Sequence, residues 1–139
     1  MNYSMKLFFL ICSAFLFCSC DKIFLDVEGK EADLQGKWQM NNADTVYYNF
    51  QNNLFLYQIY RVKDQMSGAY GYYVMRGDTA IDILLLRKHS PFPLDYLGWD
   101  TIYTSDGNDT ICKLFKIKQL TNKKLILSSD REDISFHKF

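Results

Sequence analysis

Hydrophobic and polar positions alternate in short runs along most of the chain, from Leu34 to Phe139. The runs are rich in aromatic and β-branched residues, and turn residues such as Gly77-Asp78 separate them. Alternation with a period of two is typical of a β-strand that buries one face. The pattern predicts eight strands, at residues 34–40, 45–50, 54–62, 69–76, 79–87, 110–120, 124–128 and 133–139.

Eight strands in sequence predict an all-β fold, because no amphipathic segment of helical length interrupts them. The order favours an eight-stranded antiparallel up-and-down barrel, with a strongly curled, half-open meander as the alternative. One connection, Lys88 to Asp109, is too long for a hairpin turn. We expect it either to cap one end of the barrel or to contain a short helical turn around Leu94 to Leu97.

The interior of an eight-stranded barrel is just wide enough to be filled by side chains or to hold one small ligand. The predicted inward residues are Trp38, Met40, Val46, Tyr48, Phe50, Leu56, Tyr60, Tyr72, Val74, Leu84, Phe115, Ile117, Leu125, Leu127, Ile134 and Phe136. Most of them are large, which favours a filled interior over a cavity. Of this set, Tyr48, Tyr60 and Tyr72 are the candidates for contact with a ligand. Alternatively, an aromatic surface that includes Tyr47, Tyr57, Tyr70 and Tyr73 would face outward and dock a partner.

The first 33 residues follow a different pattern. An apolar run from Leu7 to Cys18 follows the positive charge of Lys6. The run is shorter than the roughly 20 residues that a transmembrane helix needs, and it is typical of the apolar segment of an export signal. The segment after it, Asp21 to Asp33, is highly charged and is expected to be a tether in front of a single domain at residues 34–139.

The end of the apolar run, Phe17-Cys18-Ser19-Cys20, resembles the lipobox of bacterial lipoproteins. The resemblance implies removal of residues 1–19 as a signal peptide, acylation of Cys20 and a lipidated tether at residues 20–33. Acyl chains of this kind anchor a protein stably to a membrane. We therefore expect the cell envelope, and within it the outer membrane, with the domain facing the periplasm or the outside. The alternative is an ordinary secretory signal that is cut nearby.

Two further segments resemble the barrels of lipocalins and calycins. Gly36-Lys37-Trp38 resembles their Gly-x-Trp motif, and residues 115–129 resemble a late strand pair of small lipocalin-like lipoproteins from Gram-negative anaerobes. The resemblance implies that Gly36 and Trp38 form the floor of the barrel. It also implies a basic residue stacked on the tryptophan, for which Lys138 and Arg131 are the candidates.

A short motif, Asp-Thr followed by an aliphatic residue, occurs four times and resembles the acceptor sequence of a periplasmic O-glycosylation system. The threonines are Thr45, Thr79, Thr101 and Thr110. The alternative is local chemistry, in which the Asp closes a turn and the β-branched Thr begins a strand. Both interpretations place these residues at the entries of strands.

Charge and motif content argue against other functions. The 16 basic and 16 acidic residues balance and alternate along the chain, so no basic stripe is available for nucleic acid. His89 and His137 lack metal-ligand spacing, and no hydrolase or phosphate-loop motif is present. We predict no enzymatic activity, no metal and no cofactor. Cys112, the one cysteine outside the signal and its cleavage site, is expected to be a small buried apolar residue.

The sequence thus predicts a lipid-anchored envelope protein of binding type. The leading hypothesis is a small apolar ligand in the barrel mouth, under the Lys88 to Asp109 connection. The alternative is a protein-interaction or inhibitor module with a filled barrel, in which Phe92 and Trp99 protrude from that connection toward an envelope or host protein. A deep apolar cavity would favour the first, and a filled interior under a protruding aromatic loop would favour the second.

Overall fold

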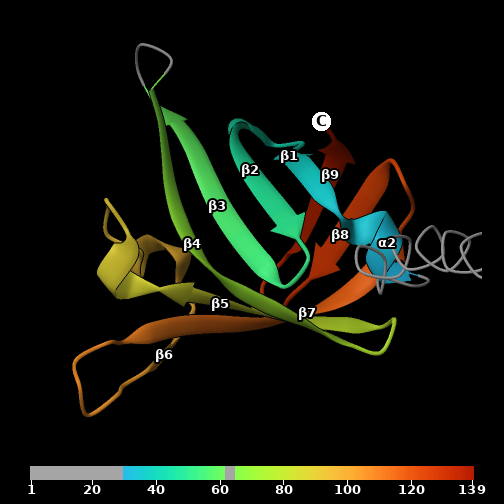
Figure 1. Cartoon of the computed structure of the whole chain (residues 1–139). Coiled ribbons are helices and arrows are strands. Elements are labelled where there is room, and N and C mark those ends of the chain that lie inside the picture. The colour runs from blue at the N-terminus through green and yellow to red at the C-terminus, as the bar shows by residue number, and fades with distance from the viewer. Residues whose placement is uncertain (1–29, 62–64) are drawn as a thin grey trace, which may run out of the picture.

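The computed structural model describes residues 30–61 and 65–139 (Figure 1). Its elements are α2 (Lys30–Leu34), β1 (Gly36–Met40), β2 (Ala43–Gln51), β3 (Leu54–Arg61), β4 (Gln65–Arg76), β5 (Ala80–Leu86), the 3₁₀ turns η1 (Arg87–His89) and η2 (Asp95–Leu97), β6 (Asp100–Ile102), β7 (Thr110–Leu120), β8 (Lys124–Ser128) and β9 (Asp133–Lys138). The proposed signal peptide, Cys20 and most of the proposed tether lie outside the described residues. The last residues of that tether are not an extended linker, because Lys30 to Asp33 belong to α2.

Eight strands close into an antiparallel barrel. Neighbours along the chain pair from β1 to β5 and from β7 to β9, while β1 pairs with β9 and β5 pairs with β7. The predicted up-and-down barrel is therefore confirmed, and the half-open meander is excluded. A ninth strand, β6, lies within the long connection and pairs with β7. The alternation pattern missed it because three residues are too few to show a period.

Large side chains fill the interior of the barrel. The fully buried ones include Trp38, Tyr48, Phe50, Phe55, Tyr73, Phe115 and Phe136, and aliphatic residues of β5 and β8 join them in one cluster. Tyr48 lies near the centre of this cluster, since its ring centroid is 4.7 to 6.4 Å from the centroids of four other rings. The prediction of a filled interior is consistent with this packing.

The inward face was predicted wrongly for β3, β4 and β5. Tyr57 pairs with Tyr48 and Phe55 pairs with Phe50, so the odd-numbered residues of β3 point inward. Leu56, Tyr60, Tyr72, Val74 and Leu84 therefore point outward, whereas Tyr57 and Tyr73 are buried inside. Both faces of these strands are apolar, so alternation alone does not distinguish them.

The helix α2 covers one end of the barrel (Figure 1). Trp38 is buried there, and its indole Nε1 donates a hydrogen bond to the carbonyl of Leu34 at 2.7 Å. The structure places Lys138, not Arg131, on the tryptophan, with its Nζ 4.5 Å from the centroid of the Trp38 ring. The same Nζ donates to the carbonyl of Asp33 at 2.8 Å. Gly36 has a φ of 113°, a left-handed value that lets the chain turn from α2 into β1.

The long connection caps the opposite end and also contains a helical turn, η2, so both expectations for it hold. Phe92 is only 6% exposed and, with Leu94, packs into the core. Trp99 is half-buried and also packs against the core. The expectation that Phe92 and Trp99 protrude is therefore wrong. The exposed aromatic residues of this connection are instead Tyr103, at 80%, and Tyr96, at 60%.

Gly71 is a point of close backbone approach between β4 and β5. A Cβ at Gly71 would overlap the carbonyl oxygen of Leu84 and lie 2.9 Å from the Cα of Leu85. We predict that Gly71→Ala lowers the free energy of unfolding by about 3 kcal/mol, because the backbone has to shift. Gly68→Ala on the same strand is the matched control, since its Cβ would meet nothing closer than 3.6 Å. Equal urea midpoints for the two variants would contradict this packing.

Candidate ligand pocket beside the capping segment

The barrel wall has a gap on one side of β7. At the start of β7, Thr110 pairs with both Leu86 of β5 and Ile102 of β6. Farther along, Lys116 pairs with both Ala80 of β5 and Ser128 of β8. Thus β6 and β8 share one side of β7, and among the described strands none pairs with residues 113–115 on that side.

A pocket of about 190 Å³ lies at this gap. The segment around η2, strand β7 and the turn between β8 and β9 enclose it. Its lining residues are Tyr96, Leu97, Gly98, Trp99, Lys113, Phe115, Ser129, Arg131, Glu132 and Ile134. The rings of Trp99 and Phe115 meet edge to face with their centroids 5.8 Å apart, so one part of the pocket is an aromatic wall.

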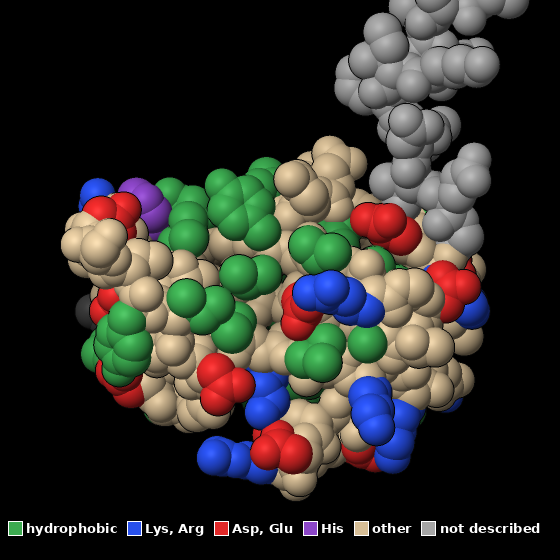
Figure 2. All heavy atoms as spheres, turned by 90° about the horizontal axis from the view of Figure 1, so that it is seen from below, with side chains coloured by type: hydrophobic (Ala, Val, Ile, Leu, Met, Phe, Trp, Pro, Cys, Tyr) green, Lys and Arg blue, Asp and Glu red, His purple; other side chains and the backbone are tan. Residues whose placement is uncertain are grey.

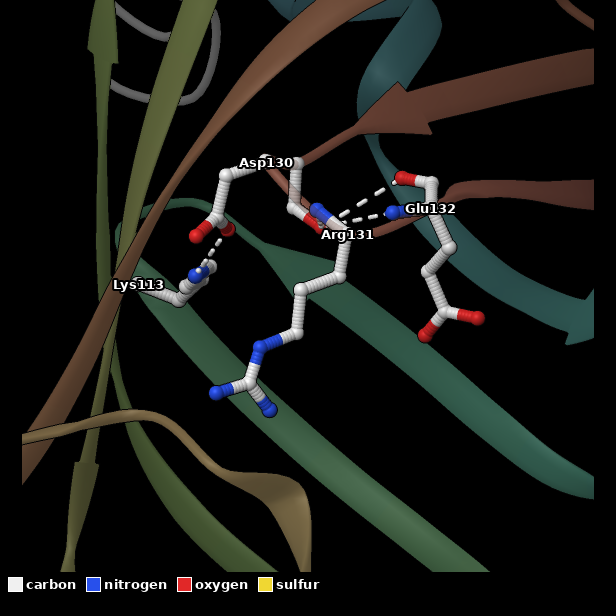
Figure 3. A network of polar contacts seen from close by, with 5 residues as sticks. Lys113, Asp130, Arg131 and Glu132 are labelled. Carbon is white, nitrogen blue, oxygen red and sulfur yellow. Dashed lines mark hydrogen bonds and ion pairs between the residues drawn. The ribbon is translucent and has the colours of Figure 1, made fainter.

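The polar part of the pocket is held by the turn at Ser129 (Figure 3). The Ser129 Oγ accepts hydrogen bonds from the backbone N–H groups of Arg131, at 3.3 Å, and Glu132, at 3.4 Å. Lys113 donates to the carboxylate of Asp130 at 2.8 Å. This hydrogen bond and the lysine charge hold the pKa of Asp130 below its usual range.

Arg131, unlike Lys113, forms no ion pair among the described residues. Its guanidinium lies against Gly98, where a Cβ would be 2.8 Å from Nη1. Gly98 has a φ of 65°, so a glycine suits both the backbone and the space. Figure 3 shows the guanidinium apart from the carboxylates of Asp130 and Glu132, and within the described chain no carboxylate forms an ion pair with it. It is thus a cation available to a bound molecule.

Buried phenols lie below the pocket. The Tyr96 hydroxyl donates to the Tyr57 hydroxyl at 2.9 Å. Burial, together with this hydrogen bond, raises the pKa of Tyr57, and burial with the charges of Tyr96 and Glu132 raises the pKa of Tyr48. Both phenols therefore stay neutral at physiological pH.

The predicted ligand-contact residues do not come together. Trp99 lines the pocket and Tyr48 lies inside the barrel, whereas Phe92 is buried under the cap. Tyr72 is on the outer surface. Tyr60 is also outside, where its hydroxyl accepts a hydrogen bond from Lys37 at 3.3 Å.

Sequence reasoning missed Tyr96, Lys113 and Arg131 as pocket residues. The available signals were the Ser129 turn and the glycine after η2. Neither signal indicates that the two segments meet across β7.

The four threonines of the Asp-Thr motif differ in exposure. Thr45 and Thr79 are exposed next to the starts of strands, whereas Thr101 and Thr110 are half-buried within the β6 and β7 pair. Arg87 Nη2 also donates to the Thr101 hydroxyl at 3.5 Å. Thr45 and Thr79 are therefore the better candidates, and glycosylation at one or more of the four threonines stays a prediction.

Cys112 is half-buried on the outer side of β7 rather than within the core, and partial burial raises the pKa of its thiol. In the described ranges no group of His, Cys, Asp and Glu side chains is arranged to hold a metal ion. The only helix described, α2, has five residues, and no helix in this part of the chain is long and apolar enough to cross a bilayer.

The buried phenols lead to a prediction about alkaline stability. Because the pKa values of Tyr48 and Tyr57 are higher in the folded state than the usual value of about 10, folding favours the neutral phenols. This contribution is fully present below pH 10, and it is lost as the pH rises from there toward the folded pKa. We predict that the free energy of unfolding, from urea titrations between pH 8 and 11, falls less steeply above pH 10 in Tyr57→Phe than in the wild type. Tyr103→Phe is the control, and equal slopes for Tyr57→Phe and wild type would count against the burial of this phenol.

Comparisons with known proteins agree with the barrel. Residues 15–139 match the model of a family described as a lipocalin-like domain. A crystal structure of a lipocalin-like protein from Bacteroides uniformis is 28% identical, with a TM-score of 0.59, and the match covers 77% of this chain and 99% of that one. An uncharacterised protein from Bacteroides eggerthii is 25% identical, with a TM-score of 0.60, and the match covers 76% of this chain and 99% of that one. No protein with a curated description matches. The family match spans most of the chain and the barrel has the corresponding architecture, so this protein belongs to the lipocalin-like domain family.

Proposed function

We propose that this protein is lipid-anchored in the cell envelope and binds a small aromatic acid in the pocket beside η2. The binding character is in keeping with a lipocalin-like barrel. The observation that carries the proposal is the pairing, in one pocket, of an aromatic wall with the unpaired guanidinium of Arg131. The sequence led us to expect a ligand in the barrel mouth under the long connection. The pocket lies beside this connection, but it is in the barrel wall.

The packed interior argues for the wall rather than the axis. Tyr48, Phe50 and Phe115 occupy the space that a ligand on the axis would need. Displacing even one such ring would break several aromatic contacts. The cost in folding free energy would be several kcal/mol, about the loss caused by truncating a buried aromatic side chain. A pocket that is already open requires no such displacement.

The volume of the pocket limits the size of the ligand. An apolar cavity of about 150 Å³ holds one benzene molecule, whereas pockets for drug-sized ligands are about 300–1,000 Å³. At about 190 Å³, this pocket accommodates a single ring with one substituent. A larger molecule would extend into solvent.

The chemistry of the lining defines the substituent. A ring packed on Trp99 and Phe115 would direct an acidic group toward Arg131. A guanidinium binds a carboxylate through two parallel hydrogen bonds, which favours this acid over a neutral group. Lys113 competes less for the acid, because Asp130 already pairs with it.

The lipid anchor rests on the lipobox-like sequence at Cys20. Ten residues, Cys20 to Gly29, precede α2, and a chain of that length extends at most about 35 Å. The anchor would therefore keep the α2 end of the barrel close to the membrane surface, with the pocket beside η2 toward the opposite end.

A protein-interaction module remains a second candidate function. The filled interior favours it by the criterion set out above, although the protruding element is not Phe92. Its support is the apolar outer surface of the barrel, which is described in the next subsection.

We predict that benzoate binds the full-length protein more tightly than benzyl alcohol, as measured by ligand-observed NMR and by tryptophan fluorescence, to which Trp38 and Trp99 both contribute. Arg131→Ala should weaken benzoate binding tenfold or more, since a hydrogen bond to a charged group contributes about 1.5–3 kcal/mol. The affinity for benzyl alcohol should change little.

Arg76→Ala is the matched control for this experiment, because it removes a guanidinium that is paired with Asp82 and does not line the pocket. It should leave benzoate binding unchanged. If Arg131→Ala binds benzoate as tightly as wild type, the assignment of the acid to Arg131 is wrong.

The anchor has its own test. The intact mass of the protein purified from its own membranes should correspond to a chain that begins at Cys20 and carries two or three acyl groups. A Cys20→Ser variant should lose the acyl mass and be released from the membrane fraction. An unacylated wild-type chain that begins near residue 20 would instead indicate ordinary secretion.

A further inference from the structure

The outer surface of β3, β4, β5 and β7 is unusually apolar. On these strands and on β6, six large hydrophobic side chains are between 39% and 55% exposed. They are Leu54, Tyr70, Tyr72, Val74, Ile102 and Leu114. We call these six residues the outer apolar face.

The strand register makes this face continuous. Leu54 lies opposite Tyr72, and Tyr72 lies opposite Leu84, which is half-buried. In the next row, Val74 and Leu114 flank Asp82. Figure 2 views the molecule from below Figure 1 and shows hydrophobic side chains gathered on the side formed by β4, β5 and β7. The six residues therefore form one surface rather than isolated exposed side chains.

The size of the face is at the upper end for a monomer and close to that of a protein interface. The two tyrosine side chains are about 150–250 Å² each and the four aliphatic ones are smaller, so six that are roughly half exposed contribute at most on the order of 500 Å². The largest apolar patch of an ordinary monomer is about 300–600 Å² and is often functional. With the half-buried Leu56, Leu84 and Leu86 around it, the face approaches the roughly 800 Å² that each partner buries in a standard interface.

The charges within the face indicate what covers it. Asp82 lies between Val74 and Leu114, and Arg76 pairs with it at 2.6 Å. A lipid surface would bury this ion pair in hydrocarbon, which is unfavourable. A protein that presents one charge of each sign is a better match, because its charges replace part of the hydration that the ion pair loses, whereas hydrocarbon replaces none.

A second copy of the chain satisfies this requirement by symmetry. A two-fold axis through the face would bring Arg76 of one protomer toward Asp82 of the other, and the reverse, so that the surface is complementary to itself. The face contains two tyrosines, Tyr70 and Tyr72, and tyrosine is enriched in the centres of protein interfaces. We infer that the outer apolar face is the interface of a symmetric homodimer.

This dimer does not depend on the proposed ligand. The face and the pocket share no residue, because Leu114 points out of the barrel while its neighbours Lys113 and Phe115 line the pocket. Substitutions in the face can therefore abolish dimerisation without affecting ligand binding, and substitutions in the pocket can do the reverse.

The test is native mass spectrometry of the full-length protein released from detergent, with light scattering on the same samples between 1 and about 100 μM. Wild type should have twice the mass of one chain. Val74→Lys and Leu114→Lys should each shift the mass to that of one chain, because a dimer would bury a new like-charge pair. Both new lysines would lie next to Asp82 in their own chain, which favours folding of the variants.

Thr45→Lys adds the same charge at an exposed position on β2, away from the face, and should remain dimeric. Circular dichroism and urea midpoints identify any variant that fails to fold, and Tyr72→Ser provides a third substitution that adds no charge. A monomeric wild type at the highest concentration would overturn the inference. So would a dimer that persists in all three folded face variants, or a wild type that is found on this face with a different envelope protein.

Discussion

The structure depends on filling a closed barrel of fixed width with aromatic rings. Eight strands leave an interior that either is occupied by side chains or contains a small cavity. Here Tyr48 has the rings of Phe55, Tyr57 and Phe136 within 4.7 to 5.7 Å, and Trp38 and α2 close one end. Because side chains alternate across a strand, a shift of register by one residue would turn these rings out to solvent. The same packing therefore selects the register and the closure of the sheet.

A filled interior has consequences for binding. Recognition has to occur at the wall or on the outside, and both places carry unusual features. The wall has a gap where β7 changes partner from β6 to β8, and the pocket there combines rings with an unpaired guanidinium. The outside carries hydrophobic residues that the barrel core does not use, on the strands whose two faces are both apolar. A small acidic ligand and a second protomer would occupy different surfaces of one rigid barrel.

The sequence predicts the architecture better than it predicts the pocket. Alternation and the Gly-x-Trp motif around Trp38 suffice for the eight strands and for the buried floor residue, because each strand of five or more residues shows its period. The inward face of β3 to β5 is not predictable from alternation, since Leu56 and Phe55 are equally apolar and only pairing with β2 separates them. The strand β6 is too short to show a period. The pocket depends on a contact between Gly98 and Arg131, which lie in irregular segments far apart in the chain, and no local pattern encodes that contact.

The most direct measurement is a crystal structure of the intact protein purified from its own membranes, without added ligand. Our account predicts an interior filled by Tyr48, Phe50 and Phe115 as described, with any co-purified molecule between Trp99 and Arg131. A molecule bound along the barrel axis, with the Tyr48 ring displaced, would contradict it.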